Sequence, residues 1–77
     1  MGFKIVKTKK LETETATARF LGVSRQTLFN WRTRGCPHSH NENNNVQYYV
    51  PDVILWRYGK NKYAETIINR WIRGNEE

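Results

Sequence analysis

Residues 16–35 read ATARFLGVSRQTLFNWRTRG, and this stretch decides the fold. Gly22 can turn the chain at positive φ without a Cβ penalty, so we predict that a first helix ends there. Ser24 is then placed to accept a backbone N–H at the start of a second helix. The inward positions of that second helix are Leu28 and Trp31, and its opposite face is polar. This spacing predicts a helix-turn-helix.

Small and apolar residues around the turn suit close packing of the two helices. Ala18 allows the helices to cross closely, Val23 is expected under the turn, and Thr13 or Thr15 is expected to cap the first helix. The spacing satisfies most of the packing demands of a helix pair that reads DNA. Short helical hairpins with a glycine turn also occur as plain structural elements. The motif therefore leaves two alternatives open, a DNA-reading helix pair and a hairpin that serves packing alone.

The chain is strongly basic for its length. Its 77 residues contain 13 Lys and Arg against 7 Asp and Glu, which gives a net charge of +6 and a pI near 9.8. This charge favours a polyanionic partner, and the alternative is a basic but inert solvated surface. A chain of this length forms one domain with one small core and lacks room for the deep pocket that most enzymes need. We therefore expect a binding protein rather than an enzyme.

Cys36 is the only cysteine, which excludes an internal disulfide and favours a reducing cytoplasm. With His38 and His40 it forms the sequence CPHSH, but a structural zinc site needs four ligands, and the sequence has no further Cys or His. We therefore expect a free thiol, two solvent-facing histidines, and neither metal nor cofactor. No apolar run approaches the roughly 18 residues that span a bilayer, and residues 1–10 do not resemble a secretory signal. The expected location is the cytoplasm, with no membrane partner.

A loop and a strand follow the second helix. The polar segment HSHNENNN, residues 38–45, is rich in turn formers, and VQYYV, residues 46–50, alternates like a strand. Together they predict a wing, so the expected fold class is mainly α with a small β wing, a winged helix-turn-helix. The expected elements of this single domain are a basic N-terminal arm over 1–12, a helix over 13–21, a second helix over 25–34, a wing over 36–50, and helices over 52–58 and 62–73.

The last two helices each carry apolar positions. In the helix over 52–58 we expect Val53, Ile54 and Trp56 to face inward, with Leu55 as a further candidate. The helix over 62–73 has an apolar stripe at helical spacing, which either closes the core or forms a surface for a second copy or a partner. The residues of this stripe are Tyr63, Ala64, Ile67, Ile68, Trp71 and Ile72.

With Leu28 and Trp31 toward the core, a helical wheel turns the polar face of the second helix outward. Gln and Asn can bond bidentately to adenine, Arg can bond to guanine, and Phe or a Thr methyl can contact the thymine methyl. An outward aromatic at Phe29 is expected to touch bases or a partner protein. The alternative for each position is a solvated helix surface. The residues expected to contact bases are Arg25, Gln26, Phe29, Asn30 and Thr33.

A second group of side chains is expected to contact phosphate, which positions a protein on DNA without reading its sequence. These residues lie in the basic arm, at the two ends of the second helix, and after the third helix. They are Ser24, Lys4, Lys7, Lys9, Lys10, Arg32, Arg34, Lys60 and Lys62.

Two segments of the chain resemble a known family. LGVSRQTLFNWRTRGCP, residues 21–37, and VQYYVPDVILWRY, residues 46–58, are similar to the winged helix-turn-helix DNA-binding domain of lambda-type phage terminase small subunits, within the broader MerR and excisionase-like group. The resemblance covers about residues 13–58. Its most specific elements are Leu21-Gly22, Asn30-Trp31, Gly35, Pro37, Tyr48 and Trp56.

This resemblance implies a sequence-specific double-stranded DNA-binding protein of phage or mobile-element type, in the cytoplasm of a bacterial host. The second helix would enter the major groove, and the wing would lie over an adjacent groove or the backbone. The implied role is target recognition in DNA packaging; the alternatives are an excisionase, a replication or transcription regulator, and a protein-interaction adaptor. Implied partners are double-stranded DNA and a phage or mobile-element protein, and the apolar stripe of the helix over 62–73 adds a second copy of the chain as a candidate. Whether the chain is a whole protein or a domain of a longer one stays open. The wing residues that the resemblance points to are His38, His40, Asn43, Asn44 and Asn45.

Overall fold

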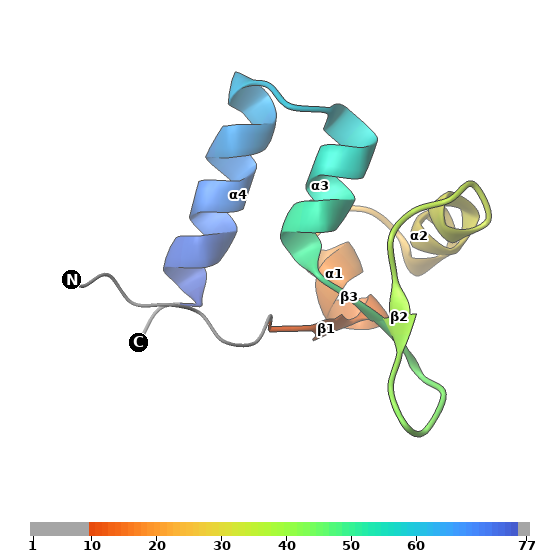
Figure 1. Cartoon of the computed structure of the whole chain (residues 1–77). Coiled ribbons are helices and arrows are strands. Elements are labelled where there is room, and N and C mark those ends of the chain that lie inside the picture. The colour runs from red at the N-terminus through yellow and green to blue at the C-terminus, as the bar shows by residue number, and fades with distance from the viewer. Residues whose placement is uncertain (1–9, 76–77) are drawn as a thin grey trace.

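The computed structural model describes residues 10–75, which form a mainly helical protein with a small antiparallel sheet (Figure 1). The expectation of a helix-rich fold with a small β part is thereby confirmed. In Figure 1, α3 lies between α4 on one side and α2 on the other. The elements in chain order are β1 (Glu12–Thr13), α1 (Glu14–Leu21), α2 (Arg25–Arg32), β2 (Ser39–His40), β3 (Val46–Tyr48), α3 (Val50–Tyr58) and α4 (Lys62–Gly74).

Local hydrogen bonds determine where the first two helices begin and end. The Ala16 backbone N–H donates to Thr13 Oγ1 at 3.0 Å, and α1 begins there. Gly22 has a φ of 74°, a left-handed conformation that ends the helix without a Cβ penalty. The Thr27 N–H donates to Ser24 Oγ at 3.0 Å at the start of α2. The predicted turn, with its cap at Ser24, is confirmed.

The bounds of α2 and α3 differ from the expected ones by a few residues. α2 ends at Arg32 rather than at residue 34, because the chain tightens into a turn in which the Arg34 N–H donates to the Trp31 carbonyl at 2.9 Å. α3 begins earlier than expected, at Val50, and holds Pro51 in its first turn. A proline is tolerated there because backbone N–H groups in the first turn have no partner within the helix.

The sheet has the strand order β1-β3-β2, with both pairings antiparallel. The central strand is shorter than the expected strand over 46–50, because the chain enters α3 after Tyr48. Of the arm expected over 1–12, residues 1–9 lie outside the described residues, and Glu12 pairs with Tyr48 in the sheet. A strand of two residues has no periodicity of its own, and only its distant partner makes it a strand.

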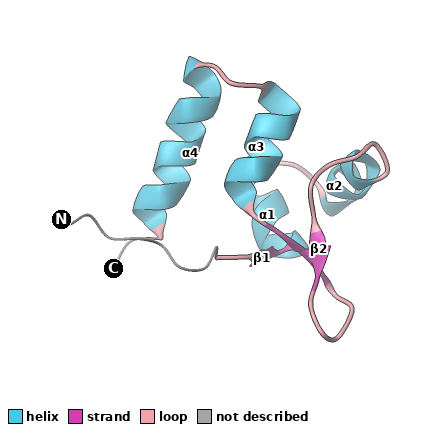
Figure 2. Ribbon diagram, in the orientation of Figure 1, coloured by secondary structure: helices cyan, strands magenta, loops and turns pink. Residues whose placement is uncertain are grey.

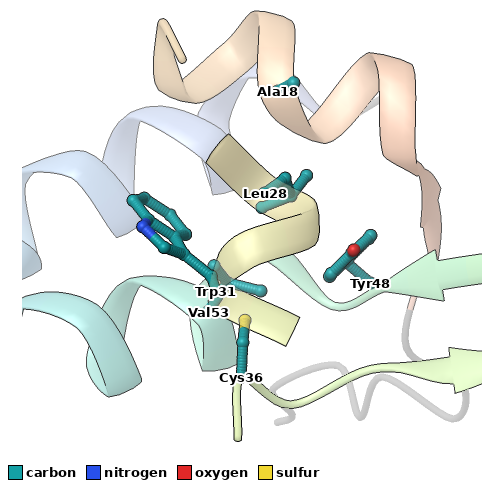
Figure 3. Packing of buried hydrophobic residues seen from close by; sticks show 6 residues of the cluster. All are labelled: Ala18, Leu28, Trp31, Cys36, Tyr48 and Val53. Atoms are coloured by element: carbon teal, nitrogen blue, oxygen red, sulfur yellow. The ribbon is translucent and has the colours of Figure 1, made fainter. Parts of the chain in front are cut away.

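Buried side chains form two clusters on either side of α3. The first joins α1, α2 and the sheet to α3, and it contains Ala18, Leu28, Trp31, Cys36, Tyr48 and Val53 (Figure 3). The second joins α3 to α4, and it contains Val50, Ile54, Ala64 and Trp71. The inward positions predicted for Leu28 and Trp31 are confirmed.

Trp56 lies at the surface, and the expectation that it faces the core is wrong. Val53 packs in the first cluster and Ile54 packs in the second, so two adjacent residues of α3 define its two buried sides. Trp56 comes two residues after Ile54, which is a rotation of about 200° around the helix axis, so the two side chains point in nearly opposite directions. Its side chain is 36% exposed, and its ring lies against the edge of the core on Trp31. Leu55, the further candidate, is also 36% exposed.

α4 packs along α3 as the second arm of a helical hairpin (Figure 1). It begins where the Ala64 N–H donates to Asn61 Oδ1 at 2.8 Å. Ala64 and Trp71 are buried, whereas Tyr63 is 59% exposed and Ile72 is 42% exposed. The apolar stripe therefore closes part of the core and leaves other apolar side chains at the surface. Within residues 10–75, no helix is long and apolar enough to cross a membrane.

Candidate nucleic-acid interface

The outer face of α2 carries the side chains that the sequence singles out for base contact. Leu28 is fully buried, and Trp31 is 8% exposed on the inner face of the helix. This anchoring leaves the opposite face in solvent, and the helix contains no acidic residue. The exposed side chains brought together along this helix and at its end are Arg25, Gln26, Phe29, Asn30 and Thr33.

Two of these polar side chains bond to each other. Gln26 Nε2 donates to Asn30 Oδ1 at 3.3 Å, one helical turn apart. This bond leaves Gln26 Oε1 as an acceptor and the Asn30 amide as a donor for an incoming partner. Thr33 Oγ1 donates to the Asn30 carbonyl at 2.7 Å, so its hydroxyl helps to close the end of α2 while its methyl group is left for apolar contact. The face therefore presents a partly preorganised donor and acceptor pair.

The Arg32 side chain bonds to another element of the protein. Its Nη2 lies 3.2 Å from Glu14 Oε2, and the Tyr48 hydroxyl donates to the same carboxylate oxygen at 2.8 Å. Burial, followed by the bond to Glu14, raises the pKa of Tyr48, so the phenol stays protonated as the donor. The network ties α2 to α1 and β3. The structure uses this guanidinium as a tie between elements, and the expectation that Arg32 contacts phosphate stays a prediction.

Phe29 is the most exposed apolar side chain on α2. It is 46% exposed, and the Arg32 guanidinium carbon lies 5.0 Å from its ring centroid. That contact is within the range of a cation–π interaction, so Arg32 holds one face of the ring. The rest of the ring is free to touch an apolar group such as a thymine methyl.

The side chains expected on phosphate lie in several different places. Arg34 and Lys10 are exposed. The Ser24 hydroxyl caps α2 and shares a 2.9 Å hydrogen bond with the Thr27 hydroxyl. Lys60 and Lys62 line a groove with Leu55 and Ile68 between α3 and α4, so the structure does not bring them to α2. Lys4, Lys7 and Lys9 lie outside the described residues.

The loop between β2 and β3 protrudes from the body of the protein (Figure 2). Asn41 organises it, because its Oδ1 accepts hydrogen bonds from the backbone N–H groups of Asn43 at 2.8 Å and Asn45 at 2.9 Å. Asn44 takes the left-handed conformation, with a φ of 67°. The role of Asn41 was not predicted from the sequence, although an Asn ahead of a polar run is a recognised signal for such a turn. The tip therefore has a defined shape and exposes Asn43, Asn44 and Asn45.

His38 and His40 are exposed at the base of this hairpin, with ring centroids 5.5 Å apart. His38 Nδ1–H donates to the Cys36 carbonyl at 2.8 Å, so this histidine bonds to the backbone rather than to the thiol. Cys36 itself is buried, and burial raises the pKa of its thiol to about 11. Among residues 10–75, no group of three or more His, Cys, Asp or Glu side chains is arranged to hold a metal ion.

Arg57 is a surface cation that was not predicted from the sequence as a site residue. Its guanidinium carbon lies 5.4 Å from the Trp31 ring centroid and 5.4 Å from that of Tyr58. With Arg34 and Trp56 it lines a depression at the end of α2. The position of Arg57 one residue after Trp56 is visible in the sequence, but its approach to α2 depends on how α3 packs.

Comparisons of this chain with protein-family models, with curated proteins and with solved structures find no match.

Proposed function

We propose that this chain is a sequence-specific double-stranded DNA-binding protein that reads the major groove with α2. The observation that carries this proposal is the exposed face of α2, where Gln26, Phe29 and Asn30 stand on a helix anchored by a fully buried Leu28. A major groove admits an α-helix and presents a distinct pattern of donors and acceptors for each base pair. A capped, core-anchored helix with amide side chains outward is suited to that task.

Each group at this surface has a defined part in the proposal. The Gln26 and Asn30 amides would bond to adenine, Arg25 would bond to guanine, and Phe29 would contact a thymine methyl. Arg34 would bond to phosphate and set the position of the helix without reading sequence. The loop from β2 to β3 would lie over an adjacent groove or the backbone, in the manner of a wing, with its asparagines as hydrogen-bonding groups.

The biological role that we propose follows the resemblance of residues 21–37 and 46–58 to terminase small subunits. In that role α2 recognises a target site for DNA packaging in a phage or mobile element. An excisionase, or a regulator of replication or transcription, would use the same surface. A neighbouring gene for a large packaging ATPase would support the packaging role, and a neighbouring integrase gene would support the excisionase role.

We expect the affinity for duplex DNA to fall steeply with salt, because the net charge is +6 and each neutralised phosphate releases counterions. If about four to six phosphates are contacted, a plot of log K against log salt should have a slope of roughly −4 to −5. Anisotropy titrations of a labelled duplex at several salt concentrations measure this slope. Replacing Lys4, Lys7 and Lys9 together with glutamine should reduce the slope and leave sequence preference intact. A flat plot would show that the basic charge does not contact DNA.

A second copy of the chain is a further candidate partner, favoured by the apolar side chains that α4 leaves at the surface. Tyr63 and Ile72 are exposed at 59% and 42%. A homodimer through α4 would cover such a face and present two copies of α2 to two half-sites. We expect a dimeric molar mass by light scattering and a monomeric mass for Ile72→Glu. A monomeric mass for the unaltered chain at concentrations that saturate DNA would exclude this candidate.

A further inference from the structure

A shallow pocket lies where the end of α2 meets the outer side of α3. Its volume is about 310 Å³, and it is lined by Trp31, Arg34, Trp56 and Arg57. We call it the Trp–Arg pocket. We propose that it binds one unpaired nucleotide of single-stranded DNA, with the base stacked on Trp56 and the phosphate between Arg34 and Arg57. The volume is at the lower end of the range for small-molecule sites, which suits a single nucleotide unit.

The aromatic wall of the Trp–Arg pocket, formed by Trp31 and Trp56, is suited to stacking with a base. Trp31 supports Trp56 from the core side, with ring centroids 6.2 Å apart and ring planes inclined by 52°. Trp56 remains 36% exposed, whereas Trp31 is 8% exposed. An indole that is held from one side and open on the other can accept a flat ring, and base–aromatic stacking tolerates any base.

The cations of the pocket point to an anionic ligand. The guanidinium of Arg57 is positioned by contacts with two rings, at 5.4 Å from the centroids of both Trp31 and Tyr58. Within residues 10–75, no carboxylate forms an ion pair with Arg57 or with Arg34, and no acidic residue lines the pocket. Two guanidinium groups with planar donor arrays match the geometry of a phosphate.

Aromatic and cationic groups together favour an unpaired nucleotide over a paired one. In a duplex, the face of each base is covered by its neighbours, so a duplex phosphate would use the arginines and leave Trp56 exposed. An unpaired nucleotide engages both the indole and the guanidinium groups. Figure 3 shows the Trp31 ring on the opposite side of Leu28 from Tyr48. Trp56 and Arg57 come from α3 rather than from the outer face of α2, and Arg34 is the residue that the pocket shares with the proposed duplex surface, so replacement of Trp56 tests the pocket without altering α2.

The experiment measures binding of a short labelled oligothymidylate by anisotropy, together with quenching of protein tryptophan fluorescence. We expect Trp56→Leu to weaken binding roughly tenfold and to remove most of the quenching. Trp56→Phe should keep most of the affinity, because it retains a ring, and Arg57→Gln should weaken binding several-fold. Arg73→Gln, which alters an exposed cation on α4, is the matched control and should bind like the unaltered chain.

Three results would overturn the proposal. The first is equal affinity of Trp56→Leu and the unaltered chain for the oligothymidylate. The second is competition by inorganic phosphate alone, with the arginines required and Trp56 dispensable, which would make the pocket a phosphate contact only. The third is an equal loss of duplex and single-strand binding in Trp56→Leu. Circular dichroism of each variant verifies folding. A parallel duplex titration of Gln26→Ala reports on α2, so failure of one proposal is distinguishable from failure of the other.

Discussion

Replacing Trp31 with alanine is expected to lower the free energy of unfolding by about 3–5 kcal/mol. Its indole is 8% exposed and belongs to the cluster that joins α2 to the sheet and α3. Removing it leaves a cavity in the core and withdraws the support of Trp56. Such a loss is a large part of the stability of a domain of this size. Urea unfolding followed by circular dichroism measures the change.

The matched control for this prediction is Trp56→Ala. Because Trp56 is 36% exposed, its removal should cost only about 1–2 kcal/mol, mainly the ring contact with Trp31. An unfolding midpoint of Trp31→Ala equal to that of the unaltered chain would mean that α2 is not oriented as described. The outward assignment of Gln26 and Asn30 would then fail with it.

Replacing Asn30 with alanine is expected to weaken binding to the preferred duplex by about 1–3 kcal/mol and to leave binding to random duplex almost unchanged. A lost bidentate contact to a base removes discrimination, whereas the electrostatic attraction to phosphate is untouched. Gln26→Ala should act in the same way. The preferred duplex is first obtained by binding-site selection, and the affinities for both duplexes are then measured at one salt concentration.

The hydrogen bond between Gln26 and Asn30 adds a sharper expectation. Because Gln26 Nε2 donates to Asn30 Oδ1 at 3.3 Å, each side chain helps to hold the other, and the double variant should lose less than the sum of the two single losses. Asn69→Ala, at an exposed position on α4, is the control and should have no effect on either duplex. Arg34→Ala should weaken both duplexes alike and lower the salt slope by about one.

Unchanged discrimination in both the Gln26 and Asn30 variants would mean that α2 is not the reading element. The exposed ring of Phe29 and the apolar face of α4 would then favour a function in protein binding. In that case Phe29→Ala should weaken capture of a partner and leave the salt dependence of DNA binding unaltered.

Much of the candidate interface follows from local spacing. The periodicity of Leu28 and Trp31 orients α2, and this orientation alone brings Gln26 and Asn30 to one exposed face. The same periodicity did not predict the bond of Arg32 to Glu14, because a helical wheel positions a side chain without its partners. Arg57 was not predicted for the related reason that its neighbours Trp31 and Arg34 come from α2 and the turn that follows it.

The sequence by itself determined the elements whose causes are local. Thr13 and Ser24 act through their hydroxyl groups, and Gly22 acts through its backbone freedom, on residues within one helical turn. Residues next to each helix end therefore determine both ends of α1 and the start of α2. The tertiary structure alone decided which residues far apart in sequence meet. It joined Arg32 and Tyr48 at Glu14, paired Glu12 with β3, and left Trp56 at the surface beside Trp31. Such contacts depend on how whole elements pack, and no local pattern encodes the distance between them.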